Sequence, residues 1–96
     1  MTPLALSCRR SGDGWTCDVT VGSDAGATRH QVVVDAATLQ DLARGAETPD
    51  RLVEASFRFL LEREPRESIL PRFALPVIGR YFPEWTEIMR RSEPAD

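Results

Sequence analysis

The sequence predicts an α+β fold: a three-stranded antiparallel β-meander followed by a short helix, one long helix packed on the sheet, and short C-terminal helical turns. Three observations predict it. Apolar and polar residues alternate through positions 3–34, which is the periodicity of half-buried strands. A helical segment with strong start signals follows at 49–64. Prolines then divide an apolar tail at 66–91 into short steps.

The strand region is predicted from alternation and from turn residues. Residues 3–10, 15–21 and 28–34 each place apolar side chains at every second position. Glycine-containing segments at 11–14 and 22–26 separate these strands, as expected for tight turns. We therefore expect consecutive strands to pair antiparallel.

Capping residues predict where the two helices begin. Asp35 is the expected N-cap of a short helix at 35–44. Thr48 is the expected N-cap of the long helix at 49–64, where Pro49 takes the first helical position. The apolar residues of the long helix cover an arc of roughly 240°, which is more than one sheet face can cover. The tail, and after it a second copy of the chain, are the expected packing partners.

The tail after the long helix is rich in both proline and apolar residues. It is predicted to form short helical turns at Ser68–Phe73, at Pro76–Phe82 and from Pro83 to Arg90. So much apolar surface is untypical of a disordered segment, and we expect the tail to wrap over the long helix. Residues 92–96 are expected to fray.

Composition and charge restrict the class of protein. The 96 residues suffice for one domain, and 42% hydrophobic with 28% charged residues is ordinary for a globular chain. The net charge is -3, which is a poor match for non-specific binding to nucleic acid, and all twelve basic residues are Arg. We find neither a signal-peptide pattern nor an apolar run long enough to span a bilayer. No membrane contact and a cytoplasmic location are therefore expected.

The two cysteines, Cys8 and Cys17, are the first candidates for chemistry. If residues 11–14 form the first hairpin loop, the two lie directly opposite each other; if the turn centres on Asp13 and Gly14, they become diagonal neighbours on one face. A disulfide is geometrically conceivable, but a reducing cytosol favours free buried thiols. Two cysteines and one histidine make a poor metal site, so no metal and no cofactor are expected.

No arrangement of residues typical of catalysis is apparent, and we expect a protein that is not an enzyme. His30 shares a strand face with Val32, and no nucleophile or carboxylate of that face is in reach, so a structural role is expected. Glu62 and Glu64 flank Arg63 at the end of the long helix and are expected to be solvated.

Arginine and aromatic residues occur together in two places. One group, near the first hairpin, is Arg9, Arg10 and Trp15. Such combinations can stack on nucleic-acid bases or form protein–protein hot spots, and the acidic net charge favours a protein. The candidates for this interaction are Arg72, Arg80, Tyr81, Trp85, Phe57 and Leu61.

Two stretches in the second half of the chain have a distinctive sequence that can be compared with known families. The segment LVEASFRFLLEREPRESIL (52–70), followed by FALPVIGRYFPEW (73–85), resembles a family of short, uncharacterised bacterial and archaeal proteins. That family shares a SFxFLLEREPxxSIL helix and a VIxRYFPE tail after a strand-rich start. One departure is Pro76, where a helix-capping Ser is more usual. The resemblance implies a similar fold, and no known activity comes with it.

Three functional hypotheses remain from the sequence. The first is a small non-catalytic protein-interaction or regulatory module, acting as a homo-oligomer or with a protein partner. The second is a nucleic-acid-binding regulator that uses the Arg and aromatic surfaces. The third is a redox-active protein that uses the pair Cys8 and Cys17. We favour the first, because apolar surface is in excess and a catalytic constellation is lacking.

Overall fold

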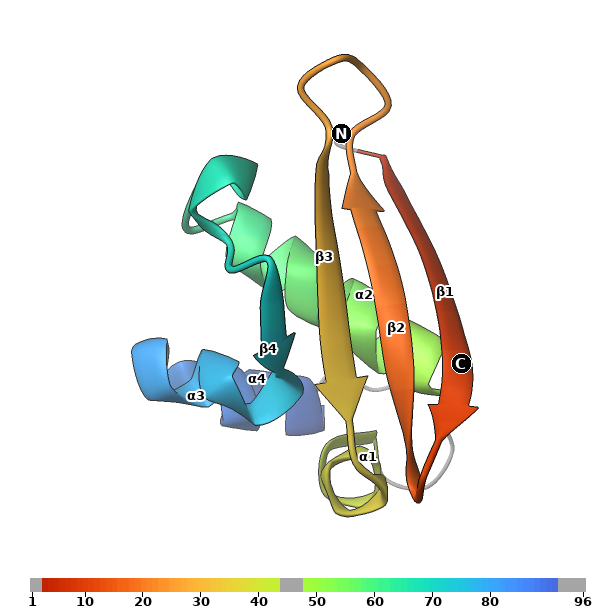
Figure 1. Ribbon diagram of the computed structural model, residues 1–96. Helices are drawn as coiled ribbons and strands as arrows, with labels where there is room; N and C mark the ends of the chain where they lie inside the picture. Colours follow the sequence, from red (N-terminus) through yellow and green to blue (C-terminus); the bar gives the residue numbers. More distant parts are fainter. Residues whose placement is uncertain (1–2, 44–47, 92–96) are drawn as a thin grey trace.

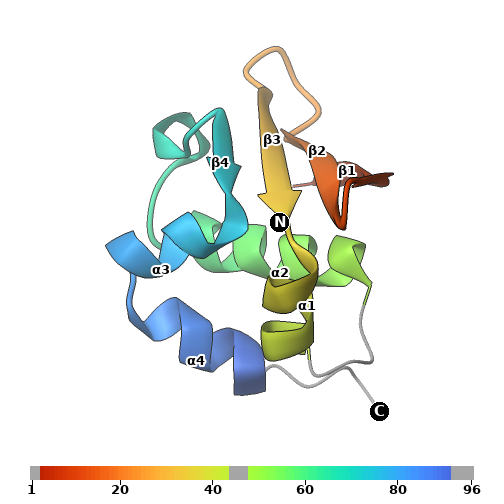
Figure 2. The same ribbon diagram turned by 60° about the horizontal axis from the view of Figure 1, so that its bottom comes forward.

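The computed structural model describes residues 3–43 and 48–91 and has an α+β fold (Figure 1). A four-stranded sheet has the order β1-β2-β3-β4. Helix α2 crosses one face of this sheet, and α4 lies on the side of α2 away from the strands (Figure 2). The elements are β1 (Leu4–Ser11), β2 (Gly14–Val21), β3 (Thr28–Val34), α1 (Ala36–Ala43), α2 (Pro49–Leu61), η1 (Arg66–Ser68), β4 (Arg72–Ala74), η2 (Leu75–Val77), α3 (Ile78–Tyr81) and α4 (Glu84–Arg91).

The three predicted antiparallel strands are confirmed, and the first of the two alternative registers is the one observed. β1 and β2 pair with Cys8 opposite Cys17 and with Ser11 opposite Gly14. A two-residue loop joins them, and its first residue, Gly12, has a φ of 63°. Only glycine adopts this conformation without steric penalty, which explains why the hairpin turns here.

A fourth strand, β4, corrects the predicted three-stranded sheet. The helical turn expected at Ser68–Phe73 is wrong, because η1 ends at Ser68 and β4 then pairs parallel to β3. Proline at position 71 disfavours helical backbone at the residue before it, and the Pro71 carbonyl accepts a hydrogen bond from the Gln31 N–H at 2.8 Å. Phe73 then points toward the core and packs against it.

The helix starts are at the predicted residues. The Asp35 carboxylate accepts a hydrogen bond from the Thr38 N–H at 2.7 Å and so caps α1. Thr48 occupies the N-cap position of α2 without a side-chain capping bond. Helix α2 ends at Leu61, earlier than the predicted residue 64, because the chain tightens into a turn ahead of Pro65. The expected end of the first helix at Arg44 and the expected frayed residues 92–96 lie outside the described residues.

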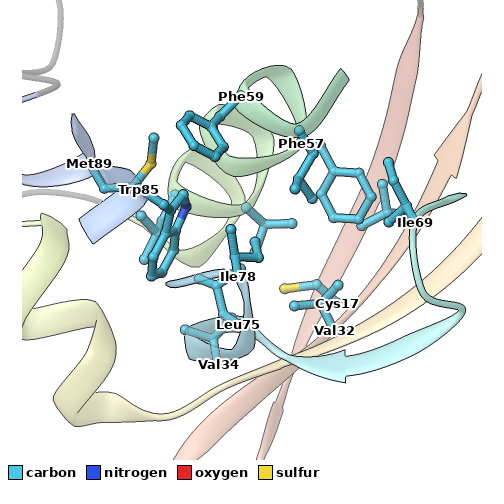
Figure 3. Packing of buried hydrophobic residues seen from close by; sticks show 14 of the residues in the cluster. Cys17, Val32, Val34, Phe57, Phe59, Ile69, Leu75, Ile78, Trp85 and Met89 are labelled. Carbon is cyan, nitrogen blue, oxygen red and sulfur yellow. The ribbon is translucent and has the colours of Figure 1, made fainter. Parts of the chain in front are cut away.

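The wide apolar arc of α2 is covered within the chain. One side of the helix, including Val53 and Phe57, packs on the sheet, and another side, including Phe59, packs on the tail. Figure 3 shows Cys17 and Val32 of the sheet, Phe57 of α2 and Ile69 of the following segment in one cluster. The tail therefore wraps over the long helix as predicted. Because the sheet and the tail together cover the apolar arc of α2, the arc by itself gives no reason to expect a second copy of the chain.

In the part of the chain that the structure covers, 3–43 and 48–91, no helix combines the length and the apolar character needed to cross a membrane.

Candidate functional site

An apolar pocket lies between the C-terminal end of α2 and the segment that follows it. It has a volume of about 220 Å³, and eight of its ten lining residues are aliphatic or aromatic. Figure 2 shows how the chain turns back from α2 to β4 and then continues into α3. These elements supply the pocket walls, so the proline-punctuated tail builds the site.

The pocket has a buried floor and an exposed rim. Leu60, Ile69 and Ile78 form the floor, and each is at most 5% exposed. Leu70 and Tyr81 belong to the rim and are 43% and 68% exposed. Only three large hydrophobic side chains are this exposed among the described residues, and two of them line this one pocket. Exposed apolar residues that gather at a concavity are typical of a binding site.

His30 fixes one wall of the pocket. Its Nδ1 lies 2.8 Å from the Leu70 carbonyl oxygen, and its Nε2 lies 2.9 Å from the Thr28 hydroxyl. A carbonyl oxygen can only accept, so Nδ1 carries a proton and donates it to Leu70, and Nε2 forms a second hydrogen bond with the Thr28 hydroxyl. The ring also packs against Phe57 at 5.4 Å between centroids. The predicted structural role of His30 is thereby confirmed.

Arg66 anchors the other end of the same wall. Its guanidinium lies against Gly22 and Gly26 in the β2–β3 loop and donates to the Asp24 carboxylate at 3.2 Å. A methyl group at either glycine would overlap the guanidinium. Because Arg66 begins η1, this contact holds the segment that leads to Ser68 and the pocket.

Glu64 is the one charged residue that lines the pocket. Partial burial in this apolar surrounding raises the pKa of its carboxyl group, because desolvation disfavours the charged form. No hydrogen bond or ion pair of its carboxylate occurs within the described ranges 3–43 and 48–91. The solvated position expected for Glu64 is therefore corrected: the carboxylate is half-buried at an apolar site.

The six predicted interaction residues are separated by the fold. Tyr81 lies at the pocket rim, which agrees with a role in contact. Arg72 and Arg80 are exposed, and Leu61 is half-buried and packs against the core. Phe57 and Trp85 are 0% and 1% exposed, so these two cannot present a surface to a partner. The last two assignments are wrong because both side chains fill the space between α2 and its neighbours.

Trp85 joins α4 to α2 through a buried polar contact. Its indole Nε1–H donates to the Ser56 hydroxyl at 3.1 Å, and this hydroxyl donates to the Leu52 carbonyl at 2.8 Å. Met89 lies in the same cluster, with its sulfur 3.6 Å from the Ser56 hydroxyl oxygen (Figure 3). Ser56 is fully buried, so it satisfies a donor that water cannot reach.

The Arg and Trp residues of the first hairpin are engaged within the chain. Arg9 forms an ion pair with Asp18 at 2.6 Å, and this contact lowers the pKa of the Asp18 carboxyl. The Arg10 guanidinium lies 5.3 Å from the centre of the Trp15 ring. Trp15 is half-buried and packs against the core, so it offers only part of its ring for stacking on a base.

Cys8 and Cys17 form a disulfide across the first hairpin. The free-thiol state expected for a reducing cytosol is therefore wrong for this structure, and the geometric alternative of a bridge between opposite residues is the one found. The bond closes a loop with a sequence separation of nine. Within 3–43 and 48–91, no group of three or more His, Cys, Asp or Glu residues is placed to hold a metal ion.

Comparisons of the chain with protein-family models, with curated proteins and with solved structures find no match. The family resemblance of segments 52–70 and 73–85 therefore stays a prediction.

Sequence reasoning missed most of the pocket. Leu70 and Glu64 were absent from the predicted interaction residues, and the pocket forms only because β4 returns to the sheet. One signal was available: Pro71 disfavours helical backbone at Leu70, which indicates that the helical turn expected at Ser68–Phe73 is interrupted there. No pattern in the sequence shows that Glu64 is half-buried, because its burial depends on residues of α3.

Proposed function

We propose that this chain is a small non-catalytic protein-interaction module, which holds an apolar side chain of a partner in the pocket between α2 and α3. A single observation carries the proposal: Leu70 and Tyr81 both line the mouth of one apolar pocket. They are two of the three exposed large hydrophobic residues in the part of the chain that the structure describes. Aromatic and aliphatic side chains seated in such pockets carry much of the free energy of binding in protein complexes.

The volume of the pocket supports a side chain over a cofactor. At about 220 Å³ it is somewhat larger than the roughly 150 Å³ cavity that accepts one benzene ring. It is smaller than the range of about 300–1,000 Å³ typical of sites for drug-sized ligands. One ring or one branched aliphatic side chain therefore matches the space.

The proposal is tested with a neutral apolar probe. We expect N-acetyl-phenylalanine amide to shift the backbone amide resonances of residues 68–70, 72–73 and 77–81 in a nitrogen-15 NMR titration. Leu70→Ser removes an exposed rim residue and should weaken this binding several-fold. Val33→Ser is the matched control, because Val33 is 49% exposed while Val32 and Val34, on the core face, are buried.

Two results would refute the interaction proposal. One is a titration to millimolar probe without shifts at these residues. The other is equal loss of binding in the Leu70 and Val33 variants. Sedimentation of the wild-type chain separates the two forms of the proposal, since a stable dimer whose formation depends on Leu70 would make a second copy the occupant.

The redox alternative and the expected cytoplasmic location both depend on the disulfide. Structural disulfides persist in oxidising compartments and are uncommon in a reducing cytosol. Alkylation of thiols at the moment of lysis measures the state of Cys8 and Cys17 in the cell. Two alkylated cysteines would support a cytoplasmic location with a pair that oxidises on demand, and two protected cysteines would count against the cytoplasm.

The nucleic-acid alternative rests on Arg10, Trp15 and the exposed arginines of the tail. It predicts binding to single-stranded DNA that weakens steeply as salt rises. The contacts of Arg9 with Asp18 and of Arg10 with Trp15 disfavour it.

A further inference from the structure

The pocket carries a charge that the proposed function does not use. Eight apolar or aromatic residues and Ser68 line it together with Glu64, so the only formal charge on its surface is negative. An apolar site with one carboxylate discriminates between ligands by the charge that they carry.

The carboxylate of Glu64 is not neutralised by its neighbours in sequence. Arg63 turns away: its guanidinium lies 3.6 Å from the centre of the Phe59 ring and 3.4 Å from the Glu84 carboxylate. Arg66 is seated in the β2–β3 loop and pairs with Asp24 at 3.2 Å. Both flanking cations are thus bound elsewhere, and no side-chain partner of Glu64 is found in the described part of the chain.

We infer that the partner presents a Lys or Arg beside the apolar side chain that enters the pocket, and that Glu64 binds this cation. The inference rests on the proposed function, because it needs an occupied pocket. It makes the recognised chemistry a short segment with one apolar and one basic residue. The net charge of -3 favours approach of a basic partner over an acidic one.

The local environment strengthens the interaction with a cation. The Glu64 carboxylate has lost part of its hydration by burial, which is also the cause of its raised pKa. An ammonium or guanidinium group restores the lost interaction, and an ion pair in a partly desolvated site is screened less by water and salt than one at an open surface. A neutral or acidic residue at the same place restores none of it.

Three matched peptides test the inference: acetyl-Ala-Phe-Lys-Ala-amide, acetyl-Ala-Phe-Gln-Ala-amide and acetyl-Ala-Phe-Glu-Ala-amide. Dissociation constants come from the same NMR titration in 0.15 M salt. We expect the Lys peptide to bind about five- to tenfold more tightly than the Gln peptide, and the Glu peptide to bind more weakly than both.

Two variants assign the preference to one carboxylate. Glu64→Gln keeps the shape of the side chain and should bring the Lys and Gln peptides within about twofold of each other. Glu62→Gln makes the same change of charge two residues away, at an exposed residue that pairs with Arg63 and does not line the pocket. It should leave the preference for Lys intact.

The outcomes separate the two proposals. If all three peptides bind the wild-type chain with equal affinity at the pocket, the interaction module stands and the cationic partner is wrong. The cationic partner is also wrong if Glu64→Gln keeps the preference for Lys, or if Glu62→Gln abolishes it. If none of the peptides binds, the proposed function fails, and this inference fails with it.

Discussion

Reduction of the disulfide should lower the stability of the protein by an amount that follows from the size of its loop. Cys8 and Cys17 are nine positions apart, so the closed loop contains ten residues when both ends are counted. The chain-entropy relation gives about 2.7 kcal/mol for a loop of this size. The expected free energy of unfolding of a chain of 96 residues is about 5–14 kcal/mol. The crosslink therefore supplies between a fifth and a half of the stability.

Urea unfolding of the oxidised and the reduced wild-type chain measures this contribution without a mutation. Both sulfurs remain in place, so packing around the fully buried Cys17 is preserved apart from the bond. We expect the two free energies of unfolding to differ by about 2–3 kcal/mol, with a fall in Tm on the order of 10–20 °C on reduction. A difference below about 0.5 kcal/mol would refute the reasoning. It would mean that the hairpin already holds these two residues together in the unfolded chain.

Three further predictions concern single residues. Ser56→Ala removes the acceptor of the buried Trp85 indole N–H and should destabilise the fold by about 1–3 kcal/mol in chemical unfolding; a loss below about 0.5 kcal/mol would contradict a stabilising role of this hydrogen bond. Asp35→Ala removes the cap of α1 and should cost about 1 kcal/mol at pH 7. The hydrogen bond from Thr38 lowers the pKa of Asp35 in the folded protein below 3.8. The part of the loss that depends on the charge of Asp35 should therefore be complete above pH 3.8 and should vanish as the pH falls through the pKa of the folded state. A loss of stability that does not change with pH would contradict the assignment of Asp35 as a charged cap. Glu64→Gln should raise the free energy of unfolding at pH 7, because burial raises the pKa of Glu64 above 4.5 and the ionised carboxylate therefore opposes folding. The gain should disappear as the pH falls below 4.5. A variant that is less stable than the wild type at pH 7 would show that the Glu64 carboxylate has a stabilising partner.

Local signals in the sequence predicted the elements well. Alternation predicted the three antiparallel strands, and the turn residues limited the first hairpin to two registers, of which the structure shows the one with Cys8 opposite Cys17. Asp35 and Pro49 marked the helix starts, because capping and the fixed φ of proline depend on nearest neighbours in the chain. Such features need no knowledge of the tertiary fold.

The features that the sequence did not predict all depend on distant contacts. β4 is three residues long, and its place beside β3 is fixed by the bond between Gln31 and Pro71 and by the inward side chain of Phe73. Trp85 was predicted to be available for a partner, but Ser56, 29 positions earlier, holds its indole in the core. The chemistry of the cysteines was misjudged for another reason. Both alternative registers placed them on one face of the hairpin, and the assumed compartment then argued for free thiols.

The contact of the Arg66 guanidinium with Gly22 and Gly26 matters for any design that transfers the pocket to another protein. The residues that line the pocket lie within 60–82. One wall, however, is held through Arg66, which contacts a loop some forty positions earlier in the chain at Gly22, Asp24 and Gly26. If only the second half of the chain is transferred, the Arg66 guanidinium loses its contacts with the β2–β3 loop. Lysine cannot replace it, since a single ammonium lacks the flat fork that lies along both glycines. The smallest portable unit therefore includes the β2–β3 loop together with Arg66.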